Sequence, residues 1–229
     1  MRRTVIALSA LTALTSLAIG GANAATPKPK PVKVSCKVIT DGAGDATYNN
    51  VPGSDSDDVV GGDIASNAQT MTVLIRTKAL AYPDPQWAPG RVYSVSFTPK
   101  GSAYDEVFVA ARTYPQGVQY ILGHRAADPT SGINTSYKDA DVTGSVTPAS
   151  GEIRINVPMS ALAKMGKIAK GTVIKGATAK VERILGQGAV PSQDVNGTRV
   201  PLGGLLLQFD ISDGGSAYTL GAPSCTKVG

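Results

Sequence analysis

Five aspartates near the start of the predicted domain are the residues whose types and spacing best suit a chemical role. Asp41, Asp45, Asp55, Asp57 and Asp58 fall within 18 positions of a glycine-rich segment. Ca²⁺ is bound by six to eight oxygen ligands, many of them carboxylate oxygens, so this segment predicts a calcium site. The alternative is a solvated turn in which the aspartates hydrogen-bond to their own backbone.

A proline-rich loop at 81–89 carries a second candidate site, for ligand binding. It contains Tyr82 and Trp87, the only tryptophan of the chain. Exposed aromatic faces beside a few polar groups are typical of small-ligand and sugar sites. We therefore predict a binding platform of Tyr82 and Trp87, which Tyr114 and Tyr120 extend if they lie at the same edge. The alternative is that Trp87 closes one end of the domain as a packed ring.

Catalytic residues are not predicted, and we expect the protein not to be an enzyme. His124 is the only histidine, which excludes histidine-rich zinc sites and the His-Glu-x-x-His motif. The chain has no Gly-x-Ser-x-Gly nucleophile elbow and no glycine-rich phosphate loop between a strand and a helix.

The basic residues do not indicate a nucleic-acid partner. The formal net charge is +5, and two of these charges belong to Arg2 and Arg3 at the N-terminus. Several lysines of the remaining chain lie together at 28–37. Nucleic-acid-binding domains usually gather basic residues on one folded surface, whereas this arrangement predicts a basic arm.

Residues 1–24 have the layout of a cleavable signal peptide. The arginine pair precedes an apolar stretch, Val5–Ile19, and a small-x-small site ends at Ala24. The stretch is shorter than the roughly 20 residues of a comfortable membrane span, although an uncleaved anchor is the alternative. We expect a secreted protein that is not embedded in the membrane. Residues 25–32 alternate proline and lysine and form either a semi-rigid linker or an unstructured terminus.

The two cysteines, Cys36 and Cys225, lie near the two ends of the mature chain. An even cysteine count in an oxidising compartment predicts one disulfide. Closing so long a loop would stabilise the fold by about 5 kcal/mol in the chain-entropy model. Two free thiols are the alternative.

The elements around these residues are predicted to be β-strands. Apolar residues alternate with polar ones in several segments, most clearly where Tyr93, Val95 and Phe97 alternate with Ser94 and Ser96. Period-two alternation places one set in the core and the other in water. Further strands are predicted at 71–76, 106–111, 119–123, 142–146, 153–157, 172–184 and 205–211. Residues 33–229 therefore form a single all-β domain, an antiparallel β-sandwich of jelly-roll or immunoglobulin-like type.

Two segments depart from the strand pattern. Residues 158–165 lack β-branched side chains and are followed by Gly166, which predicts a short helical crossover. Residues 186–204 are rich in Gly, Pro, Ser and Asn and predict a long loop.

The order of these features resembles that of the DOMON-like β-sandwiches, and within them the family 9 carbohydrate-binding modules. The matching segments are Asp41-Gly42-Ala43-Gly44-Asp45, the aspartate-rich 55–60, the strand at 70–76, Tyr93-Ser94-Val95-Ser96-Phe97, and Gly151-Glu152-Ile153-Arg154-Ile155-Asn156-Val157-Pro158. The resemblance implies two antiparallel sheets packed face to face. Members bind sugars or haem or have no known ligand, so the fold alone does not give the function.

We expect a secreted, non-catalytic binding module for a glycan or a cell-envelope polymer, held through Tyr82 and Trp87, with Ca²⁺ as an optional structural ion. The alternative is a structural or protein-interaction domain of the envelope without a small-molecule site. The sequence leaves the oligomeric state open.

Overall fold

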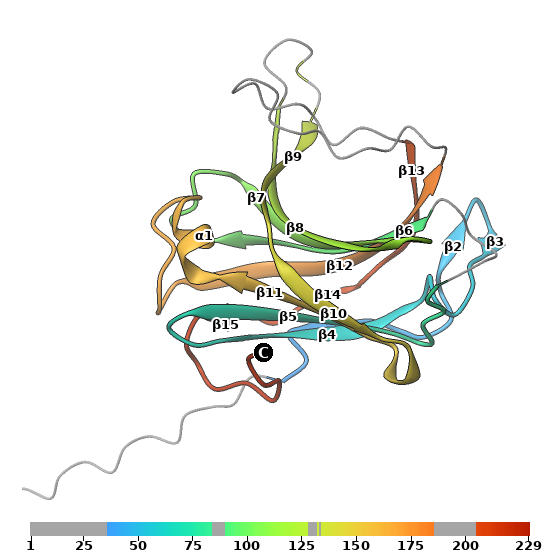
Figure 1. The fold of residues 1–229 in the computed structure, drawn as a ribbon, viewed down its shortest axis with the longest axis horizontal. Helices are drawn as coiled ribbons and strands as arrows, with labels where there is room; N and C mark the ends of the chain where they lie inside the picture. The colour runs from blue at the N-terminus through green and yellow to red at the C-terminus, as the bar shows by residue number, and fades with distance from the viewer. Residues whose placement is uncertain (1–35, 84–89, 128–131, 133, 186–204) are drawn as a thin grey trace, which may run out of the picture. The chain divides into compact units, whose positions relative to one another are not determined.

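The computed structural model describes residues 36–83, 90–127, 132, 134–185 and 205–229, which belong to one compact unit. Two antiparallel sheets pack face to face in this unit (Figure 1), and its one α-helix among the described residues is five residues long. The predicted all-β sandwich with a short helical crossover is confirmed. Trp87 and the loop at 186–204 lie outside the described residues, as do the predicted signal peptide and linker.

The first sheet has six strands, and every neighbouring pair is antiparallel. In spatial order they are β10 (Thr143–Thr147), β11 (Glu152–Pro158), β5 (Thr70–Thr77), β4 (Val59–Ser66), β1 (Ile39–Thr40) and β14 (Gly214–Gly215). The last pairing joins the first described strand to a segment near the C-terminus, so the two ends of the domain meet in this sheet.

The second sheet has seven strands and is strongly curved. In spatial order they are β13 (Leu205–Ile211), β12 (Val173–Leu185), β6 (Gly90–Pro99), β7 (Glu106–Tyr114), β8 (Gly117–Ala127) and β9 (Asn134–Asp141), with β15 (Tyr218–Thr219) also paired to β12. In Figure 1 the edge strands β9 and β13 turn away from the first sheet. Register shifts interrupt the β8–β9, β12–β13 and β6–β12 ladders, and such bulges bend a strand and increase its twist. The outer face of this sheet is therefore concave.

Small elements complete the chain. They are the hairpin of β2 (Thr47–Tyr48) and β3 (Val51–Pro52), the 3-10 turn η1 (Pro148–Ser150) and the helix α1 (Met159–Ala163). The helix lies inside the predicted 158–165 segment and directly follows β11, so it links that strand to the second sheet.

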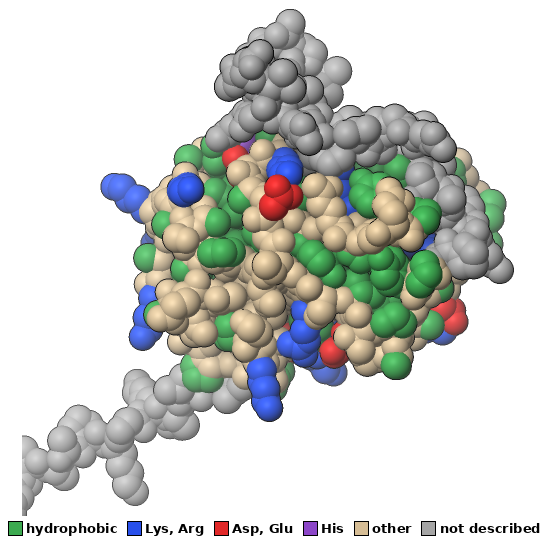
Figure 2. Space-filling view, in the orientation of Figure 1, with side chains coloured by type: hydrophobic (Ala, Val, Ile, Leu, Met, Phe, Trp, Pro, Cys, Tyr) green, Lys and Arg blue, Asp and Glu red, His purple; other side chains and the backbone are tan. Residues whose placement is uncertain are grey.

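The main core lies between the sheets. Tyr93, Val95 and Phe97 of β6 pack in one cluster with Val73 of β5 and Ile155 of β11, all nearly inaccessible to water. Burial of one side chain of this size contributes about 1.5–3 kcal/mol to the stability of the fold. The buried side chains come from alternate residues of each strand, as the period-two pattern predicts. On the surface, the Lys and Arg side chains visible in Figure 2 are scattered, with Asp and Glu side chains among them.

The C-terminal segment covers the outer face of the first sheet. The predicted disulfide is confirmed, with a Cα–Cα distance of 5.2 Å between Cys36 and Cys225. Buried Asp63 of β4 holds both ends of the domain, because it accepts hydrogen bonds from the Val38 amide at 3.1 Å and the Thr226 hydroxyl at 3.0 Å. The two ends of the domain are therefore tied together on this side of the first sheet.

Candidate functional site

The four aromatic residues of the predicted platform do not form one surface. Tyr120 of β8 packs against the core between the sheets, where burial raises the pKa of its phenol, with Tyr82 a lesser cause. Tyr114 of β7 packs instead against Phe108 and Ile121 on the outer face of the same sheet. Tyr82 and Tyr120 are therefore neighbours, Tyr114 lies on the opposite face, and Trp87 is outside the described residues.

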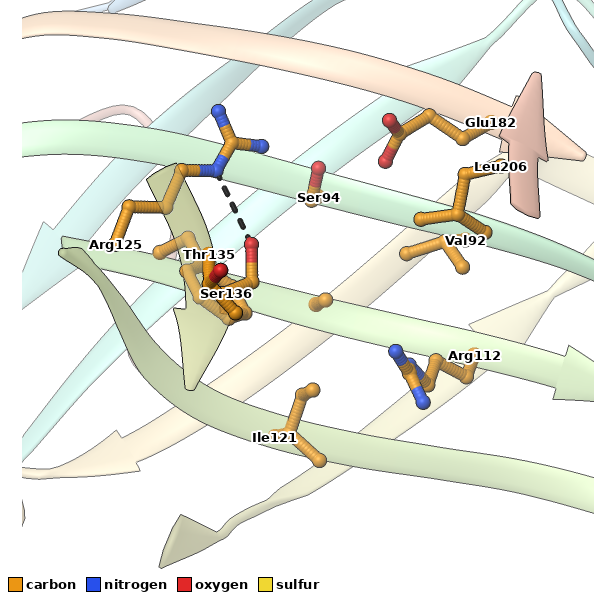
Figure 3. Close-up of a pocket in the computed structure, with 11 residues that line it drawn as sticks. Val92, Ser94, Arg112, Ile121, Arg125, Thr135, Ser136, Glu182 and Leu206 are labelled. Atoms are coloured by element: carbon orange, nitrogen blue, oxygen red, sulfur yellow. Dashed lines mark hydrogen bonds between the residues drawn. The ribbon is translucent and has the colours of Figure 1, made fainter. Parts of the chain in front are cut away.

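The concave face of the second sheet carries a hollow of about 270 Å³. Six of the seven strands of the sheet contribute to its lining, from β9 at one edge to β13 at the other, and only β15 does not (Figure 3). The polar lining residues are Ser94, Arg112, Arg125, Thr135, Ser136 and Glu182. A concave site with an apolar base and a few convergent polar groups is the usual form of a small-ligand site.

The base of the hollow is a second, smaller apolar cluster. Its buried residues are Val92, Phe108, Ala110 and Ile121. The residues that alternate with them along the same strands belong to the main core on the other face of the sheet. The strands β6, β7 and β8 are thus apolar on both faces around this point. The sequence pattern predicts water on the outer face, and that prediction is wrong for this part of the sheet.

Two polar side chains in the hollow are buried without hydrogen-bond partners among the described residues. Arg112 is 3% exposed, and its Nε and Nη1 atoms have none. Ser94 is 4% exposed, and its Oγ has none. Buried polar groups in native proteins are nearly always hydrogen-bonded, and an unpartnered one calls for an explanation. The guanidinium of arginine stays charged at all relevant pH values, so Arg112 cannot lower this cost by losing its proton.

The other charged groups of the hollow are arranged differently. Arg125 forms an ion pair with Glu106 at 3.1 Å, and its Nε donates to the Ser136 hydroxyl at 3.3 Å (Figure 3). Burial raises the pKa of Glu182, although the positive charges of Arg125, Lys180 and Arg112 oppose this. Arg125 therefore has an ion-pair partner, whereas no carboxylate of the described residues forms an ion pair with Arg112.

Two further cavities extend the hollow along the face. One, of about 500 Å³, shares Arg125, Ser136 and Glu182 with it. The other, of about 300 Å³, shares Glu106 with the second and includes Ser96. Together the three cavities give an elongated depression, which we call the groove.

No family model, curated protein or solved structure matches this chain. The resemblance to DOMON-like and carbohydrate-binding modules therefore stays a prediction.

A second feature is an acidic cluster next to the first sheet. Carboxylate oxygens of Asp41, Asp45 and Asp210 lie within 4.8 Å of one another. Asp58 is close to them, since its Oδ2 accepts a hydrogen bond from the Gly44 amide at 2.7 Å. Asp58 is 3% exposed, and its Oδ1 has no hydrogen-bond partner. Four carboxylates thus meet where the segment after β1 approaches the end of β13.

The carboxylates of this acidic cluster disfavour one another's negative charge. Burial, with the neighbouring charges of Asp210 and Asp45, raises the pKa of Asp41 from 3.8 to about 7. Burial, with Asp45 and Asp58 nearby, raises the pKa of Asp210 from 3.8 to about 6. A divalent cation would relieve this repulsion and supply a partner for the unpartnered oxygens.

The two remaining aspartates of the predicted calcium set lie elsewhere. Asp55 forms a surface ion pair with Lys78 at 2.8 Å. Asp57 is fully buried and accepts hydrogen bonds from Arg91 Nε at 2.8 Å and Arg183 Nε at 3.0 Å. The Arg183 guanidinium also lies over the ring of Phe209, 3.7 Å from its centroid. Asp57 is therefore a structural ion-pair partner and not a member of the acidic cluster. Asp210, which was not in the predicted set, is a member.

His124 lies within β8 and not at a strand end. Its ring stacks on Tyr104 with the centroids 3.6 Å apart, and Nδ1 is 2.5 Å from Asp139 Oδ2. These contacts account for a buried histidine in a packed wall.

Proposed function

We propose that the mature chain is a secreted, non-catalytic binding module whose ligand lies in the groove on the concave sheet face. The observation that supports this most directly is the hollow itself, which draws its lining from six strands and contains the buried, unpartnered Arg112 and Ser94. A ligand that enters this hollow would supply the missing hydrogen bonds. The proposed ligand is a glycan or another cell-envelope polymer, because the groove is elongated and extends beyond a single cavity.

The proposed location outside the cell rests on two observations. The sequence of residues 1–24 has the layout of a signal peptide, and disulfides such as Cys36–Cys225 persist in oxidising compartments. Among the helices that can be described, none is long and apolar enough to cross a bilayer.

We also propose Ca²⁺ as a structural ion, held by Asp41, Asp45, Asp58 and Asp210. Hard carboxylate oxygens from separate segments suit this cation, and the ion would join the segment after β1 to β13. Its role would be to stabilise the fold beside the sheets, since none of these residues lines the hollow.

The test is binding of residues 25–229 to insoluble polysaccharides and to purified cell walls in a sedimentation assay. Ser94→Leu fills part of the hollow without removing a hydrogen bond, because the Ser94 hydroxyl has no partner. Ser145→Leu, at an exposed position of β10 in the other sheet, is the matched control. Binding by the wild type and by Ser145→Leu but not by Ser94→Leu supports the proposal. Equal binding by all three moves the ligand site elsewhere, and no binding to any polymer favours a structural or protein-interaction domain.

A further inference from the structure

We propose that the groove selects an acidic sugar, and that the carboxylate of one sugar residue pairs with Arg112 at the base of the hollow. This inference deepens the proposed function and depends on it, because it names the chemical class of the ligand. It assigns Arg112 as the residue that distinguishes acidic from neutral glycans.

The first argument is the state of the Arg112 side chain. Its guanidinium is almost fully buried in the lining of an open cavity, and two of its three nitrogens have no hydrogen-bond partner. A buried charge that is left without an ion-pair partner strongly destabilises the folded state. The planar fork of arginine matches a carboxylate in a two-bond geometry that uses Nη2 together with either Nε or Nη1. A carboxylate on one of these edges, with a sugar hydroxyl on the other, would satisfy both free nitrogens.

The second argument is that no carboxylate of the described residues takes this role. Glu106 is already paired with Arg125. Glu182 of β12 is aligned with Val92 of β6, which in turn is aligned with Arg112 of β7. Glu182 and Arg112 are thus two strand spacings apart, about 9–10 Å at the backbone, and they form no ion pair. Figure 3 shows Arg112 and Glu182 projecting from separate strands on different sides of the hollow.

The third argument is the surroundings of Arg112, which suit a sugar. Ser94 lines the hollow beside Arg112, and Ser96, two residues along β6, lines another cavity of the groove; both are nearly buried, and neither hydroxyl has a hydrogen-bond partner among the described residues. Hydroxyl groups both donate and accept, so they can bind the hydroxyls of a pyranose. The ring of Phe108 and the side chain of Ile121 give an apolar base for its carbon face. A hollow of about 270 Å³ is at the lower end of small-ligand sites, which favours one sugar residue there with its neighbours in the rest of the groove.

A carboxylate is favoured over a phosphate by the balance of charge. Among the described residues, Arg112 is the only cation in the lining of the hollow that has no ion-pair partner, and the carboxyl group of Glu182 lies on the same face. A phosphate carries more negative charge and is usually held by several cations or by backbone amides at a helix N-terminus. The strands around the hollow offer no helix N-terminus, because their amides are used in the β6–β7 and β7–β8 ladders.

The experiment is isothermal titration of residues 25–229 with oligogalacturonate and oligoglucuronate, and with neutral oligosaccharides of the same linkage as a comparison. We expect the acidic forms to bind more tightly, and Arg112→Gln to lower their affinity by about ten-fold or more, as loss of a charge-assisted hydrogen bond implies. Arg112→Lys should restore only part of the affinity, since it keeps the charge but loses the fork. Arg154→Gln, on β11 of the other sheet, is the matched control and should bind as the wild type does.

The outcomes separate this inference from the proposed function. If neutral glycans bind as well as acidic ones, and Ser94→Leu abolishes binding while Arg112→Gln does not, the binding module stands and the acidic specificity is refuted. Tighter binding of a polyol-phosphate polymer, dependent on Arg112, refutes the carboxylate assignment. If Arg112→Gln does not fold, the wild type alone provides the test. Tighter binding of acidic than of neutral oligosaccharides, weakened by NaCl, supports the acidic specificity, and equal binding of both refutes it.

Discussion

The acidic cluster predicts that the protein becomes less stable as the pH rises from about 4 to about 7 in the absence of divalent cations. In the folded state the pKa of Asp41 is raised to about 7 and that of Asp210 to about 6, from 3.8 in each case. At pH values between the unfolded pKa of 3.8 and these raised pKa values, the folded protein binds more protons than the unfolded chain. Stability decreases with rising pH wherever the folded state binds more protons. The loss should therefore lie between about pH 4 and pH 7.

The size of the effect follows from the shifts. One pKa unit corresponds to about 1.4 kcal/mol, so the shift at buried Asp210 alone is worth about 3 kcal/mol. Asp41 is only partly buried, so solvent screens its contribution, and two neighbouring carboxylates titrate as a pair and not as a sum. We expect a combined loss of about 2–4 kcal/mol across the window. Calcium at 10 mM would restore about 1.4–2.7 kcal/mol at pH 8 if the dissociation constant is in the range of about 10⁻⁴–10⁻³ M.

Urea unfolding of residues 25–229 at pH 4, 5, 6, 7 and 8, in EDTA and in Ca²⁺, measures this directly. Asp41→Asn should lessen the pH dependence, because it removes one of the two titrating carboxyls, and it should weaken the calcium response, because it removes one ligand charge. The amide oxygen can still accept the hydrogen bonds from the Gly42 and Asp213 amides. Asp55→Asn, outside the cluster, is the control and should behave as the wild type. A wild-type stability that is flat or rises from pH 5 to 8 in EDTA, with no calcium effect, would refute the reasoning.

Three further predictions concern stability and can be checked by urea unfolding. Replacing both Cys36 and Cys225 by serine should lower the free energy of unfolding by about 5 kcal/mol on the chain-entropy estimate, and a loss under about 1 kcal/mol would contradict it. Asp57→Ala should cost about 3 kcal/mol or more because it removes the buried carboxylate shared by buried Arg91 and partly buried Arg183, whereas Asp55→Ala on the surface should cost under about 1 kcal/mol. Gly123→Ala should cost at least about 2 kcal/mol, because its new Cβ would lie 2.2 Å from a backbone oxygen and 2.5 Å from an aromatic carbon; a neutral result would show that the sheet adjusts there.

The sequence was sufficient for the strands with a clear period-two alternation. The alternation around Tyr93 and Ile155 places the right residues in the core, and the predicted strand at 205–211 coincides with β13. Strand β9 (Asn134–Asp141) was not predicted because its residues are mostly polar and show no apolar alternation. It is defined by its pairing with β8, which is a tertiary contact that no local pattern contains.

The candidate site was predicted only in part, for a related reason. Ser94 and Ser96 follow the polar phase of a clean strand pattern, so they were expected in water, yet both are buried in the groove. Their burial depends on the curvature of a whole sheet. Likewise Asp210 is distant in sequence from Asp41 and Asp45, and only the packing of β13 beside the first sheet brings the three carboxylates together.

The disulfide between Cys36 and Cys225 also decides how the domain responds to mechanical force. The two cysteines lie 189 positions apart, and all the strands lie between them. Tension applied between the two ends passes through the covalent bond and bypasses the hydrogen-bonded ladders. Without the bond, unravelling that loop would lengthen the chain by roughly 600 Å, at about 3.3–3.6 Å per residue. Pulling on the ends of a domain closed in this way does not open the sheets that form the groove.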